Sequence, residues 1–96
     1  MARLSVSPDA KQDLVEVFLF IAQDNLEAAR RMHSQFQQTF LTIASQPSIG
    51  RSRDELAPRI RSLAVGKYVI YYRTVGRVVR ILRLLHGARD LENLFQ

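Results

Sequence analysis

His86 is the residue of this 96-residue chain that is best suited to proton transfer. It ends an arginine-rich apolar run, in the stretch LLHGARD. A histidine has an unperturbed pKa of about 6.5, so it can serve as acid or base, and such catalysis is worth roughly 10² to 10⁴ in rate. Cations that could stabilise a pentavalent phosphate are Arg61, Arg73, Arg80 and Arg83. Together these residues could cleave RNA by attack of a 2′-hydroxyl group.

The sequence around His86 argues against that chemistry. A glycine and an alanine follow it, and no glutamate lies between Leu56 and Leu91, so this region offers no glutamate as a base. A histidine at the end of a strand can instead make a hydrogen bond to the backbone or to Asp90 and so fix a turn. Contact with a partner molecule is the third interpretation. The residues alone leave all three roles open.

Length and composition favour one compact domain spanning residues 1–96, because a chain of this size has little surface to spare for a second core. There is no cysteine, so a disulfide framework and a thiolate metal site are excluded, and a reducing cytoplasm is the expected location. No spacing of histidine and carboxylate residues indicates a metal, and we expect no cofactor. The longest apolar run, Val17 to Ala22, is far shorter than the roughly 20 residues that cross a bilayer, so no membrane contact is expected.

The net charge of +5 is unevenly distributed. Residues 1–50 carry four Lys/Arg against five Asp/Glu, a balance of −1, whereas residues 51–90 carry ten against three, a balance of +7. Twelve of the fourteen cations are arginine, whose planar fork suits carboxylates and phosphates. The basic half therefore indicates an acidic protein, a nucleic acid or both as partners. The alternative is an ordinary solvated basic face.

Local signals predict a strand and two helices in the first half. The alternating segment ARLSV is typical of a strand, and it ends at Ser7 and Pro8, which favour the start of a helix. Asn25 is the expected cap of a second helix. Apolar residues recur at three- and four-residue steps in both helices, so each has one apolar face. The short connection between them predicts an antiparallel helical hairpin. The apolar residues are Ala10, Leu14, Val17, Phe18 and Ile21 in the first helix, and Ala29, Met32, Phe36, Phe40 and Ile43 in the second.

The second half predicts three strands joined by two hairpins. The segments RIRSLAV, YVIYYR and RVVRILRLLH are rich in β-branched and aromatic residues, and glycines separate them. The expected fold is therefore α+β, in the order β-α-α-β-β-β. Arg77, Arg80 and Arg83 are three residues apart, so on a strand they would alternate between the two faces. We expect the helices to cover one face of the sheet and to leave apolar side chains and arginines exposed on the other.

Three stretches give the chain a resemblance to the ParE branch of the ParE/RelE toxin superfamily: QPSIGR (46–51), IRSLAVGKYVIYYR (60–73) and RILRLLHGARDLENLF (80–95). The resemblance covers nearly the whole chain and implies one toxin domain of a bacterial toxin-antitoxin pair. It implies a cognate antitoxin as partner, in a hetero-oligomer, and DNA gyrase as the inhibited target. On this interpretation the chain binds without chemistry of its own. The expected partner-binding residues, some of which could also lie near gyrase-bound DNA, are Arg59, Arg61, Arg73, Arg80, Arg83, His86 and Arg89.

Two other functions stay open at this stage. RelE-like members of the superfamily cut messenger RNA in the ribosome, and under that alternative His86, Arg61 and Arg83 would be the catalytic residues. Nuclease members tend to have a further acid/base tyrosine or basic cluster at the end of the last strand, which this chain lacks. A module that keeps only antitoxin binding is the third function. Whether Gln96, in the tag-like end ENLFQ, is native is also left open.

Overall fold

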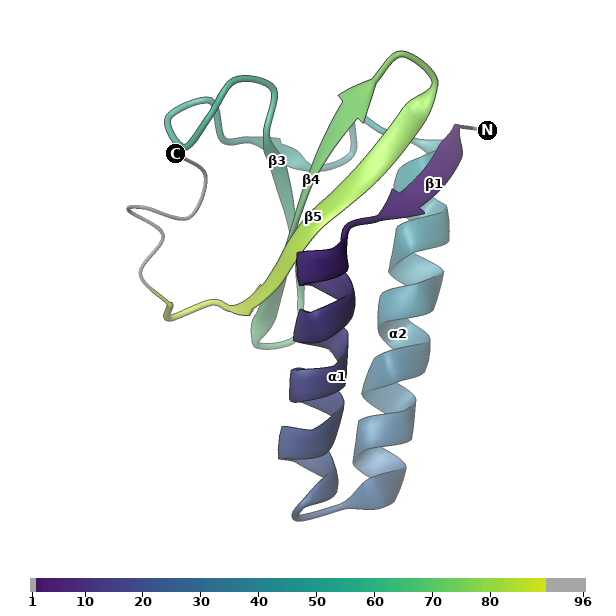
Figure 1. The fold of residues 1–96 in the computed structure, drawn as a ribbon, viewed down its shortest axis with the longest axis vertical. Coiled ribbons are helices and arrows are strands. Elements are labelled where there is room, and N and C mark those ends of the chain that lie inside the picture. Colours follow the sequence, from purple (N-terminus) through teal and green to yellow (C-terminus); the bar gives the residue numbers. More distant parts are fainter. Residues whose placement is uncertain (1, 90–96) are drawn as a thin grey trace.

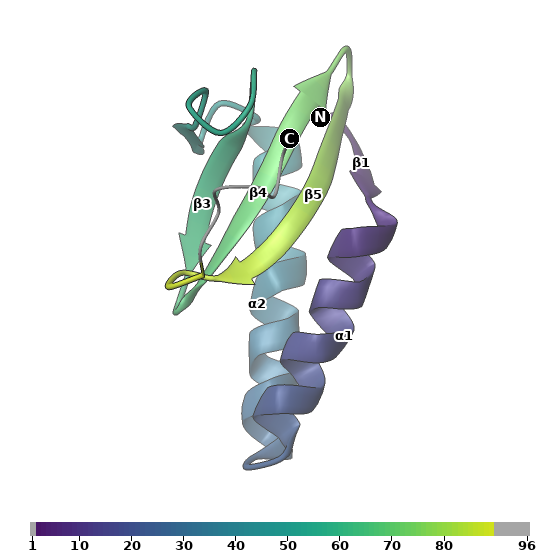
Figure 2. The same ribbon diagram turned by 60° about the vertical axis from the view of Figure 1, so that its left-hand side comes forward.

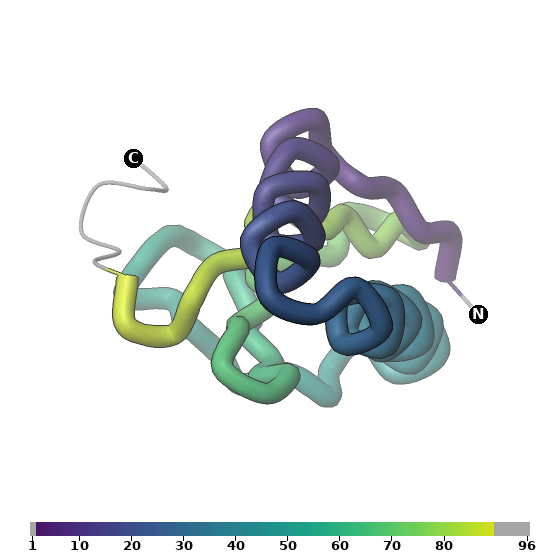
Figure 3. Tube along the Cα trace, turned by 90° about the horizontal axis from the view of Figure 1, so that it is seen from below, coloured from purple at the N-terminus to yellow at the C-terminus, as the bar shows by residue number. Residues whose placement is uncertain are grey.

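The structure is a computed structural model that describes residues 2–89, and it consists of a helical hairpin packed on one face of a five-stranded sheet. Figures 1 and 2 show α1 and α2 on the same side of the sheet, and the end-on view in Figure 3 shows the two helices side by side. The sheet order is β1-β5-β4-β3-β2. The elements are β1 (Arg3–Val6), α1 (Pro8–Ala22), α2 (Leu26–Ser45), β2 (Arg51–Ser52), β3 (Arg61–Val65), β4 (Tyr68–Val75) and β5 (Val78–His86).

Both helices begin at the predicted caps. The Ser7 hydroxyl accepts a hydrogen bond from the Ala10 N–H at 3.0 Å, and Pro8 occupies the first turn, where its missing N–H costs nothing. The Asn25 side chain accepts from the Ala28 N–H at 3.0 Å. The Ser7 hydroxyl also donates to the carbonyl of Leu82 at 2.8 Å, so the cap of α1 is fastened to β5.

The predicted three-stranded antiparallel meander is confirmed as β3-β4-β5. Each hairpin has a two-residue turn that begins with a glycine at positive φ, 59° at Gly66 and 60° at Gly76, as type II′ turns require. β1 extends the meander by pairing in parallel with β5, with Arg3 opposite Val78. The two-residue β2 on the other edge was not predicted, because a strand of that length leaves no periodic pattern.

A β-bulge interrupts the pairing of β5 with β4 between Arg80 and Arg83. Tyr71 pairs with Arg83 and Tyr72 pairs with Ile81, which leaves Leu82 without a partner. Arg80 is the cross-strand partner of Arg73 on the face away from the helices, whereas the side chain of Arg83 reaches Asp13 of α1.

The main core lies between the helices and the sheet. Phe36, Phe40 and Ile43 of α2 pack with Ile70 and Tyr72 of β4, and all five are fully buried. The apolar stripes predicted for both helices face this core. The burial of five large side chains contributes of the order of 10 kcal/mol of transfer free energy before the entropy of ordering is counted.

The opposite face of the sheet is exposed only in part. A cluster of its apolar side chains is buried, contrary to the prediction, whereas Arg73 and Arg80 on this face keep part of their surface exposed. Ile60, Tyr71 and Leu85 form a second buried cluster there, against Leu56 and Ala57 of the loop between β2 and β3. This loop is held in place by side chains, since the Arg53 guanidinium lies 5.9 Å from the centre of the Tyr71 ring. A loop that folds back over a sheet is a long-range feature that periodicity does not indicate.

Three of the large apolar side chains that are exposed lie on α1. Val15, Leu19 and Phe20 are 52%, 58% and 67% exposed, and Leu26 at the start of α2 is 46% exposed. Such a group on one helix indicates a surface that a partner covers. Among residues 2–89, no helix is long and apolar enough to cross a membrane.

Candidate functional site

His86 ends β5 and lies opposite Tyr68 of β4. The two ring centroids are 5.6 Å apart with the rings nearly perpendicular, an edge-to-face contact. The Nδ1 atom of His86 accepts a hydrogen bond from the Ala88 N–H at 3.1 Å. The prediction that His86 fixes the turn after β5 through a backbone hydrogen bond is thus confirmed, whereas Asp90 lies outside the described residues. In the neutral imidazole that accepts at Nδ1, the proton is on Nε2.

Arg83 makes a bidentate ion pair with Asp13 of α1. Its Nε and Nη2 atoms donate to the two carboxylate oxygens at 2.8 and 3.0 Å. The Asp13 side chain is 6% exposed, and it also accepts from the Leu84 N–H at 3.0 Å. Donation of hydrogen bonds to the Asp13 carboxylate raises the pKa of the Arg83 guanidinium above its ordinary value. The pair fastens α1 to β5 beyond the point where β1 ends.

Sequence reasoning did not single out Asp13, although a signal was present. Asp13 falls on the apolar stripe of α1, between Ala10 and Val17 at helical spacing. A carboxylate on a face that turns toward the core needs a cation or hydrogen-bond donors, because burying it alone is costly. The rule predicts a partner but does not say which arginine, 70 residues away, provides it.

Arg61 fastens the loop that leads from α2 into β2. Its Nη1 donates to the carbonyl of Gly50 at 2.7 Å and to that of Ser48 at 3.4 Å. The hydroxyl of Tyr72 donates to the carbonyl of Pro47 at 2.7 Å and accepts from the Gly50 N–H at 2.8 Å. Burial raises the pKa of Tyr72 above its ordinary value of 10.0. Arg61 and Tyr72 therefore hold the same loop from neighbouring strands.

The three residues proposed for RNA cleavage are not brought together. His86 pairs with Tyr68 and Arg61 pairs with Tyr72, four residues further along β4, which corresponds to roughly 13 Å of strand. Arg83 lies opposite Tyr71, and its side chain is bound by Asp13 of α1. The proton-transfer group and the two cations thus lie at different places on the sheet.

The remaining arginines of the predicted set lie in three places. Arg73 and Arg80 are direct cross-strand partners on the face away from the helices. Arg59 is exposed, has a φ of 66°, and donates its backbone N–H to the Asp54 carboxylate at 3.0 Å. Arg89 is exposed after β5 and lies near His86.

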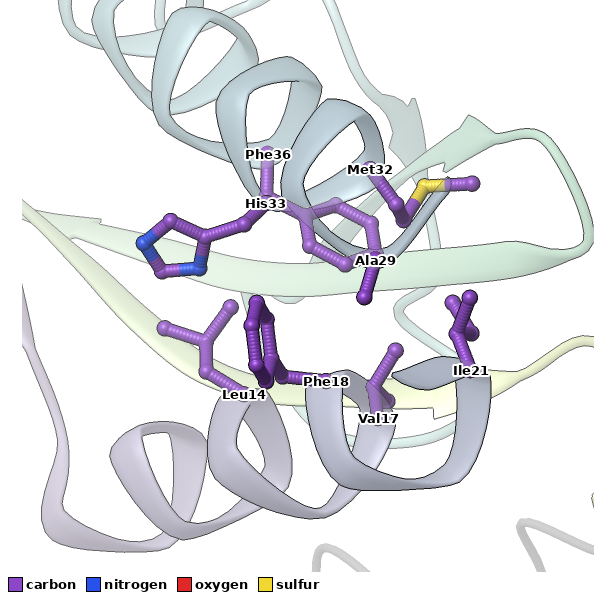
Figure 4. Close-up of a pocket in the computed structure, with 8 residues that line it drawn as sticks. All are labelled: Leu14, Val17, Phe18, Ile21, Ala29, Met32, His33 and Phe36. Carbon is purple, nitrogen blue, oxygen red and sulfur yellow. The ribbon is translucent and has the colours of Figure 1, made fainter. Parts of the chain in front are cut away.

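A groove of about 360 Å³ runs between α1 and the end of β5. Its walls combine acidic, apolar and basic side chains from α1 and β5, including Glu16, Phe20, Tyr68, His86 and Arg89. The seam between α1 and α2 differs from this groove, because the side chains there meet and leave no space for a water molecule (Figure 4).

Among residues 2–89, no cluster of three or more histidine or acidic residues could hold a metal ion.

Comparison with known proteins matches nearly the whole chain to one protein family. Residues 4–91 match the family model of the ParE toxin of the type II toxin-antitoxin system parDE. The chain is 29% identical over 92 residues to Toxin ParE3 of Caulobacter vibrioides, covering 95% of this chain and 92% of that protein. It is also 29% identical over 86 residues to Toxin RelE1 of the same organism, covering 85% of this chain and 89% of the relative.

A solved structure shares the fold. The chain superimposes on a chain of the chromosomal ParDE toxin-antitoxin system from P. aeruginosa with a TM-score of 0.75 and 19% identity. The match covers 90% of this chain and 96% of the other. The predicted β-α-α-β-β-β architecture is therefore confirmed by the elements themselves and by this neighbour.

Proposed function

The chain belongs to the ParE toxin family of type II toxin-antitoxin systems, and we propose that it inhibits DNA gyrase by binding, with residues 1–96 acting as one toxin domain. In this proposal a cognate antitoxin neutralises the toxin and forms a hetero-oligomer with it. The observation that carries the proposal is the family match over residues 4–91. The target itself, gyrase rather than the ribosome, is the part that requires an experiment.

The arrangement of His86, Arg61 and Arg83 favours binding over RNA cleavage. General acid-base catalysis requires groups within hydrogen-bonding reach of the same substrate atoms. Here Arg83 is engaged by Asp13, Arg61 is engaged by two loop carbonyls, and the Nδ1 of His86 accepts from a backbone N–H. We therefore assign Arg61 and Arg83 to holding the fold, and His86 to the turn and the wall of the groove.

The surface on α1 and the adjoining groove is the proposed antitoxin site. Val15, Leu19 and Phe20 are largely exposed, which supports the docking of an amphipathic segment. The groove between α1 and β5 continues this surface and adds Glu16 and Arg89 as polar contacts. The chromosomal ParDE system among the structural neighbours is named as a toxin-antitoxin system, which supports an antitoxin as the partner.

A plasmid assay tests the proposed target. Purified chain is added to DNA gyrase, ATP and relaxed plasmid, and the products are separated after protein is removed. We expect loss of supercoiling and accumulation of linear, cleaved plasmid, because an inhibitor that stalls gyrase traps the cleaved DNA. Unaffected supercoiling at a large excess of the chain would contradict the proposal.

A matched pair of histidine variants tests the alternative of a ribonuclease. His86→Gln removes the proposed acid or base, and His33→Gln makes the same change at an exposed position on α2. We expect both variants to arrest growth as strongly as the unaltered chain. If only His86→Gln loses toxicity while messenger cutting on ribosomes disappears with it, acid-base catalysis is the mechanism. One relative of the chain is named Toxin RelE1, so the ribonuclease alternative has to be tested.

A further inference from the structure

Three arginines cross the sheet on the face away from the helices, and we call them the arginine row: Arg3 of β1, Arg80 of β5 and Arg73 of β4. Arg73 and Arg80 are direct cross-strand partners. Arg80 is in turn the partner of Ser5 in β1, and Arg3 lies two residues before Ser5, hence on the same face. The row thus spans three neighbouring strands.

Within residues 2–89, the arginine row makes no ion pair with a carboxylate. The Nε of Arg73 donates to the carbonyl of Pro58 at 3.2 Å, and the Nη1 of Arg80 donates to the Ser5 hydroxyl at 2.6 Å. Both acceptors are neutral. The ion pairs of the described chain involve other arginines, Arg30, Arg53 and Arg83. Like charges directly opposite one another destabilise a sheet, so the charges of the row do not themselves stabilise the fold.

The anchoring hydrogen bonds prepare these guanidinium groups for an anion. A guanidinium has five N–H donors, and each of the two bonds occupies one of them, which leaves most of the donors of Arg73 and Arg80 for a ligand. The bonds also restrict the orientations of the two guanidinium groups, so less side-chain entropy is lost when a ligand binds. Two arginine forks side by side suit the oxygens of a phosphate group.

We infer that the arginine row binds the sugar-phosphate backbone of a nucleic acid, without reading its sequence. Phosphate contacts require cations and fix position, whereas specific protein interfaces need a core of apolar anchors. Val75, two residues from Arg73 on β4, is exposed beside the row, but Val15, Leu19 and Phe20 lie on α1, which packs on the other side of the sheet. The inference concerns the affinity of the chain itself and stands whether or not gyrase is its target.

Fluorescence anisotropy with a labelled duplex of mixed sequence, about 20 base pairs long, tests the inference. The variant Arg73→Gln/Arg80→Gln removes two cations from the row. The control Arg30→Gln/Arg31→Gln removes two exposed cations from α2. We expect the control to bind like the unaltered chain, and the row variant to bind roughly tenfold more weakly at about 50 mM salt. The slope of log K against log salt should shrink by about 1.8, or 0.9 for each lost phosphate contact.

Folding is checked separately by thermal unfolding. Because the two arginines repel each other, we expect the row variant to unfold at the same temperature as the unaltered chain or higher. Arg73→Lys/Arg80→Lys keeps the charge and should retain most of the affinity. Equal binding by the row variant and the α2 control would overturn the inference, as would no binding of the duplex at about 50 mM salt. Tighter binding of a poly-glutamate peptide than of the duplex, dependent on the same arginines, would overturn it in favour of an acidic protein.

Discussion

Replacing Asp13 with alanine should destabilise the fold more than any exposed substitution on α1. The change leaves the Leu84 N–H without its acceptor, at a cost of about 1 to 3 kcal/mol. It also removes both hydrogen bonds to Arg83. The Arg83 side chain is 19% exposed and can partly rehydrate. The loss of the ion pair should therefore cost about 1 kcal/mol, and not the several kcal/mol of a fully buried pair. We expect the free energy of unfolding to fall by about 3 kcal/mol. For a domain of this size that corresponds to roughly 12 to 24 °C in Tm.

Urea unfolding followed by circular dichroism measures this loss, with Glu16→Ala as the control. Glu16 is an exposed carboxylate on the same helix, so its replacement should change the free energy of unfolding by less than about 0.5 kcal/mol. Arg83→Met leaves the Asp13 carboxylate without its cation and should cost about 3 kcal/mol. The double variant Asp13→Ala/Arg83→Met should then be less destabilised than the sum, by at least about 1 kcal/mol. Strict additivity, or an Asp13→Ala variant as stable as the control, would refute the role assigned to the pair.

Three further changes test the loop between α2 and β2 and the cap of α1 by the same unfolding measurement. A Cβ at position 50 would lie 2.5 Å from the Tyr72 hydroxyl oxygen, so Gly50→Ala should destabilise by about 1 to 3 kcal/mol, and an unchanged stability would contradict this packing. Tyr72→Phe leaves the Gly50 N–H unpaired and should cost about 1 to 3 kcal/mol. Because the pKa of Tyr72 is raised in the folded state, the unaltered chain should lose stability as pH rises above 10.0. This loss should be steeper than that of Tyr72→Phe, and parallel pH profiles of the two proteins would contradict the expectation. Ser7→Ala removes both the cap of α1 and the bond to the carbonyl of Leu82, and should cost about 1 to 2 kcal/mol; a loss below about 0.3 kcal/mol would argue against the cap.

The features that sequence reasoning predicted well are those specified by neighbouring residues. Ser7 and Asn25 cap helices through bonds to residues three positions on, and Gly66 and Gly76 begin two-residue hairpins. Each of these depends on a few adjacent side chains and on backbone angles that glycine adopts readily. Local chemistry therefore sufficed for the order and the ends of most elements.

The features that it missed depend on residues far apart in the chain. The bulge at Leu82 follows from the register of β4 against β5 and not from any local signal. The loop that covers Tyr71 and Leu85 is placed by packing, and the pair of Asp13 and Arg83 joins two residues 70 positions apart. These long-range contacts decide which of the predicted arginines are engaged within the fold, and so they decide the candidate site.

The most direct test of the account is whether the purified chain, with no ribosome present, makes gyrase accumulate broken plasmid. Inhibition of gyrase by binding predicts linear plasmid that increases with the concentration of the chain, and prevention of this effect by the cognate antitoxin. Plasmid that gyrase supercoils normally in the presence of the chain, together with messenger RNA cut when ribosomes are added, would contradict the account and assign the chain to the ribonuclease alternative.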